Sequence, residues 1–178
     1  EQGPLGPVRV MKMALGVAEG INALHTQGIL HLDLTASNVM LTTLADGGER
    51  THVIDFGLAI APEGAASKNL VGTAHYLSPE QILGHHVGAR ADVYALGVML
   101  YFALCGQHPF DGPDPRSILR QHLREAPKPL GRRVSKTMGV PRRLISLIHA
   151  CLDKDASRRP DSLAVVIEVL RELTATPD

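Results

Sequence analysis

The most constraining feature of the sequence is an almost uninterrupted apolar run from Val93 to Cys105, broken only by Gly97. It is too short to cross a bilayer, because a membrane-spanning helix needs about 20 apolar residues, and we expect no membrane segment in this chain. A helix that is apolar on nearly all sides must be surrounded by other elements. The run therefore predicts a buried central helix over 92–105.

Apolar residues at helical spacing predict further helices before and after the central one. The first covers 8–27 and is followed by a glycine, the usual residue at a helix C-terminus. Asp114 followed by Pro115 predicts an N-cap and the first turn of another helix. Two more helices are expected after Pro141 and after the turn at 160–162.

A β-hairpin is expected between the first helix and the central one. The runs at 38–43 and 51–55 are strand-like, and a turn sequence at 45–50 joins them. Residues 56–91 contain several Gly and Pro without sustained periodicity, which predicts a long loop, and loops of this length are usually functional or mobile. The expected fold class is mainly α with a small β-hairpin.

Charge and cysteine content narrow the kinds of partner and compartment. The chain has 18 Lys and Arg against 18 Asp and Glu, a formal net charge of zero. Because binding to nucleic-acid phosphates requires a basic surplus, we expect no nucleic-acid partner. Cys105 and Cys151 form neither a disulfide framework nor a metal-binding spacing, so we expect thiols in a reducing, cytoplasmic compartment.

Two acids and an amide bracket the predicted hairpin. Asp33 precedes the first strand, Asn38 stands at its start and Asp55 ends the second strand. Oxygen ligands at hairpin ends can hold Mg²⁺, which needs only one or two protein oxygens when phosphates supply others. A separate carboxylate could then orient a hydroxyl nucleophile. Taken alone, the three residues are better explained by a structural role.

The strings around these residues resemble the motifs of protein kinases. HLDLTASN at 31–38 resembles the HRDLxxxN catalytic loop, DFG stands at 55–57, and SPE at 78–80 takes the place of APE. Further matching strings are GTAHYLSPE at 72–80, DVYALG at 92–97 and DASRRP at 155–160. The resemblance covers nearly the whole chain and looks most like bacterial kinases.

The resemblance implies a serine/threonine protein kinase that transfers the γ-phosphate of ATP, bound with Mg²⁺, to protein hydroxyls. Asp33 would orient the substrate hydroxyl and accept its proton, and Asn38 and Asp55 would be the magnesium ligands. Met40 would pack beneath the adenine ring. Thr73 would meet the catalytic aspartate on the substrate side.

The same resemblance implies structural roles for five other residues. His31 would pack within the catalytic loop, and Phe56 would line the boundary between the two kinase lobes. Asp92 would hold the catalytic-loop backbone from the head of the central helix. Glu80 and Arg159 would form a buried ion pair that anchors the end of the activation segment.

Two departures from the kinase pattern leave a second function open. Leu32 replaces the Arg that pairs with a phosphate on the activation loop, so regulation by that phosphorylation is not expected. Thr35 replaces the Lys that contacts the transferring phosphate, and losing one such electrostatic donor can cost about 2.7–4 kcal/mol. Both favour a pseudokinase, a nucleotide-binding or scaffolding module. The intact Asp33, Asn38 and Asp55 oppose it.

The sequence lacks the glycine-rich loop, the strand Lys and the helix Glu of the kinase N-terminal lobe. Residues 1–7 contain no initiator Met and look like a linker. We therefore expect residues 1–178 to be a partial kinase domain, the C-terminal lobe, with the N-terminal lobe preceding it. The complete domain would be α+β, and the isolated fragment is expected to be poorly active or inactive.

Basic residues are concentrated in one segment of this neutral chain. Nine of the 18 Lys and Arg lie between Arg116 and Arg143, against one acid, Glu125. Arg116, Arg120 and Arg124 recur every four residues and so share one helix face. A solvated basic face explains this, and so does a docking surface for an acidic protein partner or substrate.

Overall fold

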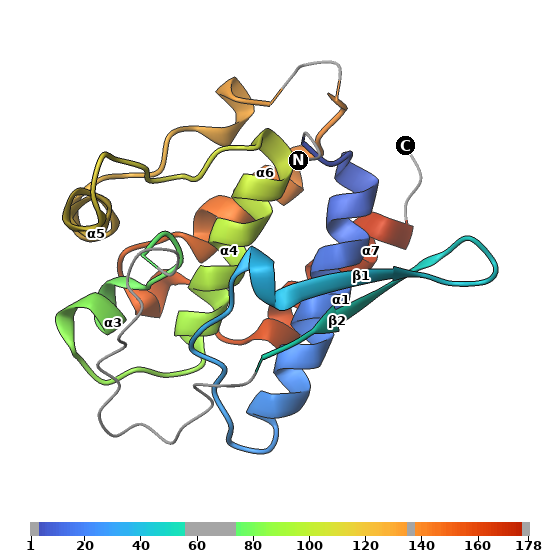
Figure 1. The fold of residues 1–178 in the computed structure, drawn as a ribbon, viewed down its shortest axis with the longest axis horizontal. Coiled ribbons are helices and arrows are strands. Elements are labelled where there is room, and N and C mark those ends of the chain that lie inside the picture. Colours follow the sequence, from blue (N-terminus) through green and yellow to red (C-terminus); the bar gives the residue numbers. More distant parts are fainter. Residues whose placement is uncertain (1–3, 56–73, 135–137, 176–178) are drawn as a thin grey trace.

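The computed structural model describes residues 4–55, 74–134 and 138–175. Its helices are α1 (Pro7–His25), α3 (Pro79–Leu83), α4 (Arg90–Cys105), α5 (Pro115–Arg124), α6 (Arg142–Cys151) and α7 (Leu163–Ala175). Its strands are β1 (Val39–Thr43) and β2 (Glu49–Val53), which form one antiparallel sheet. The fold is therefore mainly helical with a two-stranded hairpin, as expected (Figure 1).

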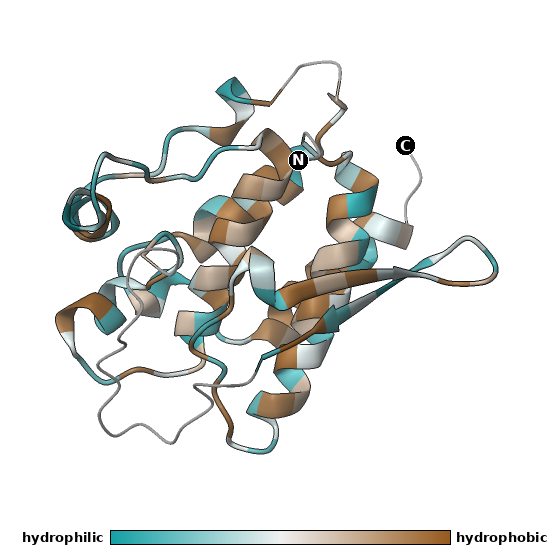
Figure 2. Ribbon diagram, in the orientation of Figure 1, coloured by the Kyte–Doolittle hydropathy of each residue, from teal (hydrophilic) through white to brown (hydrophobic). Residues whose placement is uncertain are grey.

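Helix α4 is the centre of the core. Twelve of its sixteen residues are buried, and it packs against α1 and α6. Figure 2 shows mainly apolar colours along its length. The helix ends at Gly106, whose φ of 69° lies in the left-handed region that favours glycine. In the described part of the chain, no helix is long and apolar enough to span a membrane.

Helix α1 connects the hairpin to the helical core. It packs against β2 on one side and against α7 on another. The strands pair in register from Val39 with Val53 to Thr43 with Glu49. The turn beyond them projects from the helical body, as Figure 1 shows. This packing holds the inner end of the hairpin, where the predicted site residues lie, against the core.

The expected loop over 56–91 is wrong in its second half, which contains α3 and the start of α4. Ser78 begins α3 with a capping box, in which its Oγ accepts from Gln81 N and its N donates to Gln81 Oε1. Pro79 occupies the first helical position, and Gly84 ends the helix with a φ of 65°. These local signals specify α3, which is too short for hydrophobic periodicity to reveal it.

The close approach of α4 and α6 gives a test of the core. A Cβ added at Gly97 would lie 2.6 Å from Cys151 Cβ. We expect Gly97→Ala to lower the free energy of unfolding by about 1–3 kcal/mol, because the helices must separate. Urea denaturation of the full-length protein measures this.

Gly20→Ala in α1 is the matched control, since the nearest atom to its new Cβ is Val53 Cγ2 at 3.7 Å. Replacing a helical glycine without a clash should stabilise the protein by about 0.5–1 kcal/mol. Equal effects of the two substitutions would contradict the tight α4–α6 contact.

Candidate functional site

The buried carboxylate of Asp92, in the first turn of α4, holds the loop that connects α1 to β1. It accepts hydrogen bonds from His31 N at 3.0 Å and from Leu32 N at 2.8 Å. His25 Nε2, in the last turn of α1, lies 2.7 Å from Asp92 Oδ2. One carboxylate thus joins the central helix to the end of α1 and to the loop backbone.

Leu32 has a strained backbone at this loop. Its φ of 61° is in the left-handed region, which costs a residue with a Cβ roughly 1–2 kcal/mol. Its N–H is held by Asp92, and its carbonyl accepts from Gln81 Nε2 at 3.0 Å. Such a conformation persists where the surroundings over-determine it. The peptides on both sides of Leu32 are therefore fixed, and the position of the next residue, Asp33, is fixed with them.

The structure brings Asn38 and Asp55 to the same end of the hairpin. Asn38 Nδ2 donates to the Asp33 carbonyl at 2.8 Å, which directs the amide within the loop. The Asn38 carbonyl accepts from Ile54 N at 2.8 Å. Asp55 follows at once, exposed and with a φ of 62°. Two hydrogen bonds, one from the Asn38 side chain and one between backbone groups, thus join the loop at Asp33 to the end of the hairpin beside Asp55.

His31, directly before Leu32 in the loop, is fully buried. Burial lowers the pKa of His31, and the carboxylates of Asp92, Asp33 and Asp55 act in the opposite direction. Because burial outweighs them, the imidazole is neutral at neutral pH. Its Nδ1 accepts a hydrogen bond from Asp33 N at 3.4 Å, which connects the ring to the loop backbone.

The donor set fits a nucleotide-bound Mg²⁺ better than a metal held by protein alone. Asn38 and Asp55 offer an amide oxygen and a carboxylate at neighbouring positions. Within residues 4–55, 74–134 and 138–175, no group of three or more His, Cys, Asp and Glu could hold a metal ion. Two protein oxygens suffice for Mg²⁺ where phosphate oxygens and water complete its six ligands.

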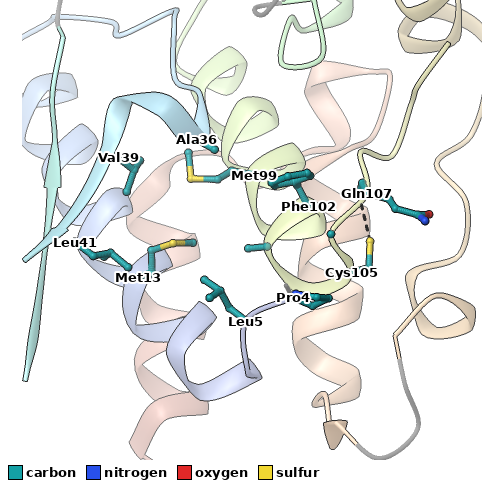
Figure 3. Close-up of a pocket in the computed structure, with 12 residues that line it drawn as sticks. Pro4, Leu5, Met13, Ala36, Val39, Leu41, Met99, Phe102, Cys105 and Gln107 are labelled. Atoms are coloured by element: carbon teal, nitrogen blue, oxygen red, sulfur yellow. Dashed lines mark hydrogen bonds between the residues drawn. The ribbon is translucent and has the colours of Figure 1, made fainter. Parts of the chain in front are cut away.

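An apolar groove of about 460 Å³ lies beside the site, between α1, β1 and α4 (Figure 3). Its lining includes Val39 and Leu41 of β1 and Met99 of α4. Since successive strand residues point to opposite faces, Met40 faces away from the groove. Its side chain is 46 % exposed. The hairpin therefore presents Met40 on an open surface next to Asn38.

Thr35, at the position of the kinase Lys, is buried within the loop. Its Oγ1 lies 2.7 Å from Ser37 Oγ, so the two hydroxyls bond to each other. Thr73 and Phe56, the other residues predicted for the site, lie outside the described residues.

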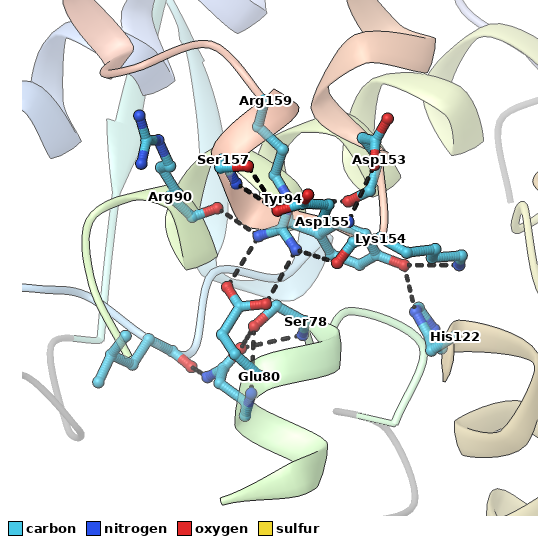
Figure 4. A network of polar contacts seen from close by, with 12 residues as sticks. Ser78, Glu80, Arg90, Tyr94, His122, Asp153, Lys154, Asp155, Ser157 and Arg159 are labelled. Atoms are coloured by element: carbon cyan, nitrogen blue, oxygen red, sulfur yellow. Dashed lines mark hydrogen bonds and ion pairs between the residues drawn. The ribbon is translucent and has the colours of Figure 1, made fainter. Parts of the chain in front are cut away.

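Glu80 and Arg159 form an ion pair that joins α3 to the turn before α7 (Figure 4). Both guanidinium Nη atoms donate to the carboxylate at 2.8 Å, and the Arg159 side chain is fully buried. Arg159 also donates to the carbonyls of Asp153 and Arg90 and lies over the ring of Tyr94. The pair fixes α3, and through Gln81, which donates to the Leu32 carbonyl, it supports the loop between α1 and β1.

Two residues that hold the loop between α1 and β1, His25 and Gln81, could not be identified from the sequence. The spacing of Ser78 and Gln81 matches a capping box, and that signal could have located α3. No local signal shows that Gln81 reaches Leu32, 49 residues earlier, or that His25 reaches Asp92, 67 residues later. Both contacts depend on how α1, α3 and α4 pack.

Asp92→Asn tests the loop anchor. An amide keeps one acceptor oxygen but turns an NH₂ group toward N–H donors. We expect the free energy of unfolding to fall by about 3 kcal/mol, because buried hydrogen-bonded donors lose their charged partner. Asp161→Asn, which removes an exposed partner of Arg90, should cost less than about 1 kcal/mol. Equal losses in chemical denaturation would contradict the anchoring role.

Glu80→Gln tests the ion pair by its pH dependence. Burial raises the pKa of Glu80, but hydrogen bonds and charge from Arg159 outweigh it and hold the pKa below its ordinary 4.5. The stabilisation is therefore complete above pH 4.5 and is lost as the pH falls through the folded-state pKa. At pH 7 the substitution should cost about 3–5 kcal/mol.

The difference between wild type and Glu80→Gln should shrink steadily in denaturation curves taken below pH 4.5. Glu168→Gln, an exposed acid on α7, is the control and should change stability by less than about 0.5 kcal/mol. A difference that stays the same at pH 7 and pH 3.5 would exclude a charged pair as its source.

Comparison with known proteins identifies the family of the chain. The family model of the protein kinase domain matches residues 1–170. The chain is 41 % identical over 174 residues to serine/threonine-protein kinase pkn2 of Myxococcus xanthus, covering 94 % of this chain and 21 % of that protein. It is 40 % identical over 133 residues to PknB of Mycobacterium tuberculosis, covering 72 % and 21 %.

A third relative, PknB of Mycobacterium leprae, is 35 % identical over 166 residues, with 91 % of this chain and 26 % of that protein covered. The chain thus spans about a fifth to a quarter of the length of these relatives. The matched family model covers most of the sequence, and the chain belongs to the protein kinase family.

Proposed function

We propose that the chain is the C-terminal lobe of a serine/threonine kinase, with residues 1–178 forming part of a kinase domain. The protein that contains it transfers the γ-phosphate of ATP to Ser or Thr hydroxyls of proteins. The observation that carries this proposal is the arrangement of Asp33, Asn38 and Asp55 around the loop held by Asp92. The relatives named as serine/threonine kinases support the same reaction.

In this proposal Asp33 orients the substrate hydroxyl and accepts its proton as the oxygen bonds to phosphorus. Asn38 and Asp55 hold Mg²⁺, which neutralises charge on the phosphates when bound. The fixed backbone at Leu32 and the Asn38–Asp33 hydrogen bond keep these side chains in place before substrate arrives. Such preorganisation lowers the barrier because little reordering remains to be done in the transition state.

Further roles follow from the same proposal. Met40, open on the hairpin surface, packs beneath the adenine ring. Thr73 meets Asp33 on the substrate side, and Phe56 lies at the boundary with the N-terminal lobe. Protein substrates are the partners that the family implies, and an acidic protein binds at Arg116, Arg120 and Arg124.

The cysteines support a reducing, cytoplasmic compartment for this lobe. Cys105 and Cys151 are both free thiols. Burial raises the pKa of Cys151 to about 12, which keeps it protonated and unreactive. A buried thiol of this kind serves packing rather than redox chemistry.

The pseudokinase alternative depends on Thr35 and Leu32, which remove two cations of the kinase pattern. The hydroxyl of Thr35 bonds to Ser37 and supplies no charge to a phosphate. The intact Asp33, Asn38 and Asp55 and the kinase names of the relatives do not favour this alternative. Because Thr35 stands in place of a cation, we expect phosphate transfer to be slow.

Phosphate transfer from labelled ATP to a protein substrate tests the proposal in the full-length protein. Asp33→Asn should reduce transfer about 100-fold or more, because the substrate hydroxyl loses its base. Affinity for Mg-ATP should stay within a few fold, since Asp33 is not proposed as a metal ligand. Asp46→Asn, in the exposed hairpin turn, is the control and should leave the rate unchanged. Equal signal from wild type and Asp33→Asn would establish the pseudokinase instead.

A further inference from the structure

The exposed side of α5 carries a row of three arginines, Arg116, Arg120 and Arg124, here named the arginine row. All three are exposed, and none forms an ion pair with a described residue. Surface arginines elsewhere that do form ion pairs are Arg9, Arg90, Arg143, Arg158 and Arg171. The row therefore presents charge that the described part of the chain does not neutralise.

Helix stability does not explain the row. Arg116 stands in the first turn of α5, where the positive end of the helix dipole disfavours a cation. Like charges four residues apart also repel each other along a helix. Only Arg124, in the last turn, is placed where the dipole favours it. The three charges together oppose the helix that carries them, which points to a role outside the fold.

The backbone beneath the row is fixed. Asp114 caps α5 by accepting from Ser117 N at 2.9 Å. On the opposite side Ile118 and His122 are buried, and His122 Nδ1 lies 2.8 Å from Tyr94 Oη of α4 (Figure 4). The helix lies at the edge of the molecule in Figure 1. The row thus projects outward from a rigid support.

The spacing of the row indicates the form of a partner. Four helical residues rise about 6.0 Å, so the row spans about 12 Å. Two residues of an extended chain advance about 6.6 Å, so acids at three alternate positions span about 13 Å on one face. We propose that the arginine row binds an extended acidic segment of a protein partner, with carboxylates at alternate residues. This proposal specifies the form of the acidic partner proposed above, and it does not depend on whether the protein transfers phosphate.

The surroundings of the row favour a narrow acidic chain over a broad anionic surface. Asp111 and Asp114 lie at one end of α5 and Glu125 at the other, all exposed. A nucleic-acid duplex or a membrane is a broad anionic surface, and its negative charges would be repelled by these acids. A single extended segment can contact the row and avoid them. The zero net charge of the chain agrees, since it gives no general attraction for polyanions.

Binding to a labelled peptide, followed by fluorescence anisotropy with the full-length protein at low salt, tests this proposal. One peptide carries three Glu at alternate positions separated by Ser. A second has the same composition with the three Glu adjacent, so its outer carboxylates span only about 6.6 Å. We expect about fivefold tighter binding of the alternating peptide, because the adjacent one reaches fewer arginines.

Arg116→Ala, Arg120→Ala and Arg124→Ala combined should weaken that binding at least tenfold. The matched control replaces Arg50, Arg132 and Arg142 by Ala, three exposed arginines without an ion pair to a described residue. It removes the same charge and should change affinity less than twofold. Because the row opposes its helix, its loss should not lower the thermal midpoint.

Four results would overturn the proposal. The first is equal affinity for the two peptides, and the second is an equal loss of peptide affinity in the two triple variants. The third is a lower thermal midpoint of unfolding when the arginine row is removed. The fourth is binding of duplex DNA or phosphatidylserine vesicles that depends on the row and is tighter than binding of the alternating peptide. Equal affinity for the two peptides would exclude recognition of carboxylates at alternate residues. Tighter binding of DNA or vesicles would identify a different class of partner. None of these readouts uses phosphate transfer, so failure here leaves the proposed reaction untouched.

Discussion

The buried carboxylate of Asp92 is the interaction on which the rest of the structure depends. It sits in the first turn of a helix that is buried on nearly every side, so the core fixes its position. From there it holds the backbone N–H groups of His31 and Leu32, in the loop between α1 and β1, together with the ring of His25. Because a buried carboxylate is costly without such donors, the core and the loop stabilise each other.

The same arrangement explains how the chain tolerates strain at the site. Leu32, which directly precedes Asp33, and Asp55, a proposed Mg²⁺ ligand, both have positive φ values. The Leu32 peptide is held from two helices, α4 through Asp92 and α3 through Gln81. Helix α3 is itself held by the Glu80–Arg159 pair. A chain of buried polar contacts thus runs from the turn before α7 to the loop at Asp33.

Much of the architecture could be predicted from the sequence, because its causes are local. Hydrophobic periodicity predicts α1 and α7, and the cap at Asp114 correctly predicts the start of α5. The first helix is expected to continue to residue 27, but α1 ends at His25. The hairpin follows from its turn. Helix α3 was missed because five residues are too few for periodicity. The contacts of His25 and Gln81 could not be predicted, since they join residues 67 and 49 positions apart that only tertiary packing brings together.

We propose that the end of the hairpin and the loop held by Asp92 form a site for Mg²⁺ and a nucleotide. A crystal structure of the full-length protein with Mg²⁺ and a non-hydrolysable ATP analogue would reveal whether they do. We expect Asn38 Oδ1 and an Asp55 carboxylate oxygen to lie about 2.0–2.1 Å from the metal, with phosphate oxygens completing its ligands. A metal that contacts neither residue, or a nucleotide bound away from the hairpin, would show that the site lies elsewhere.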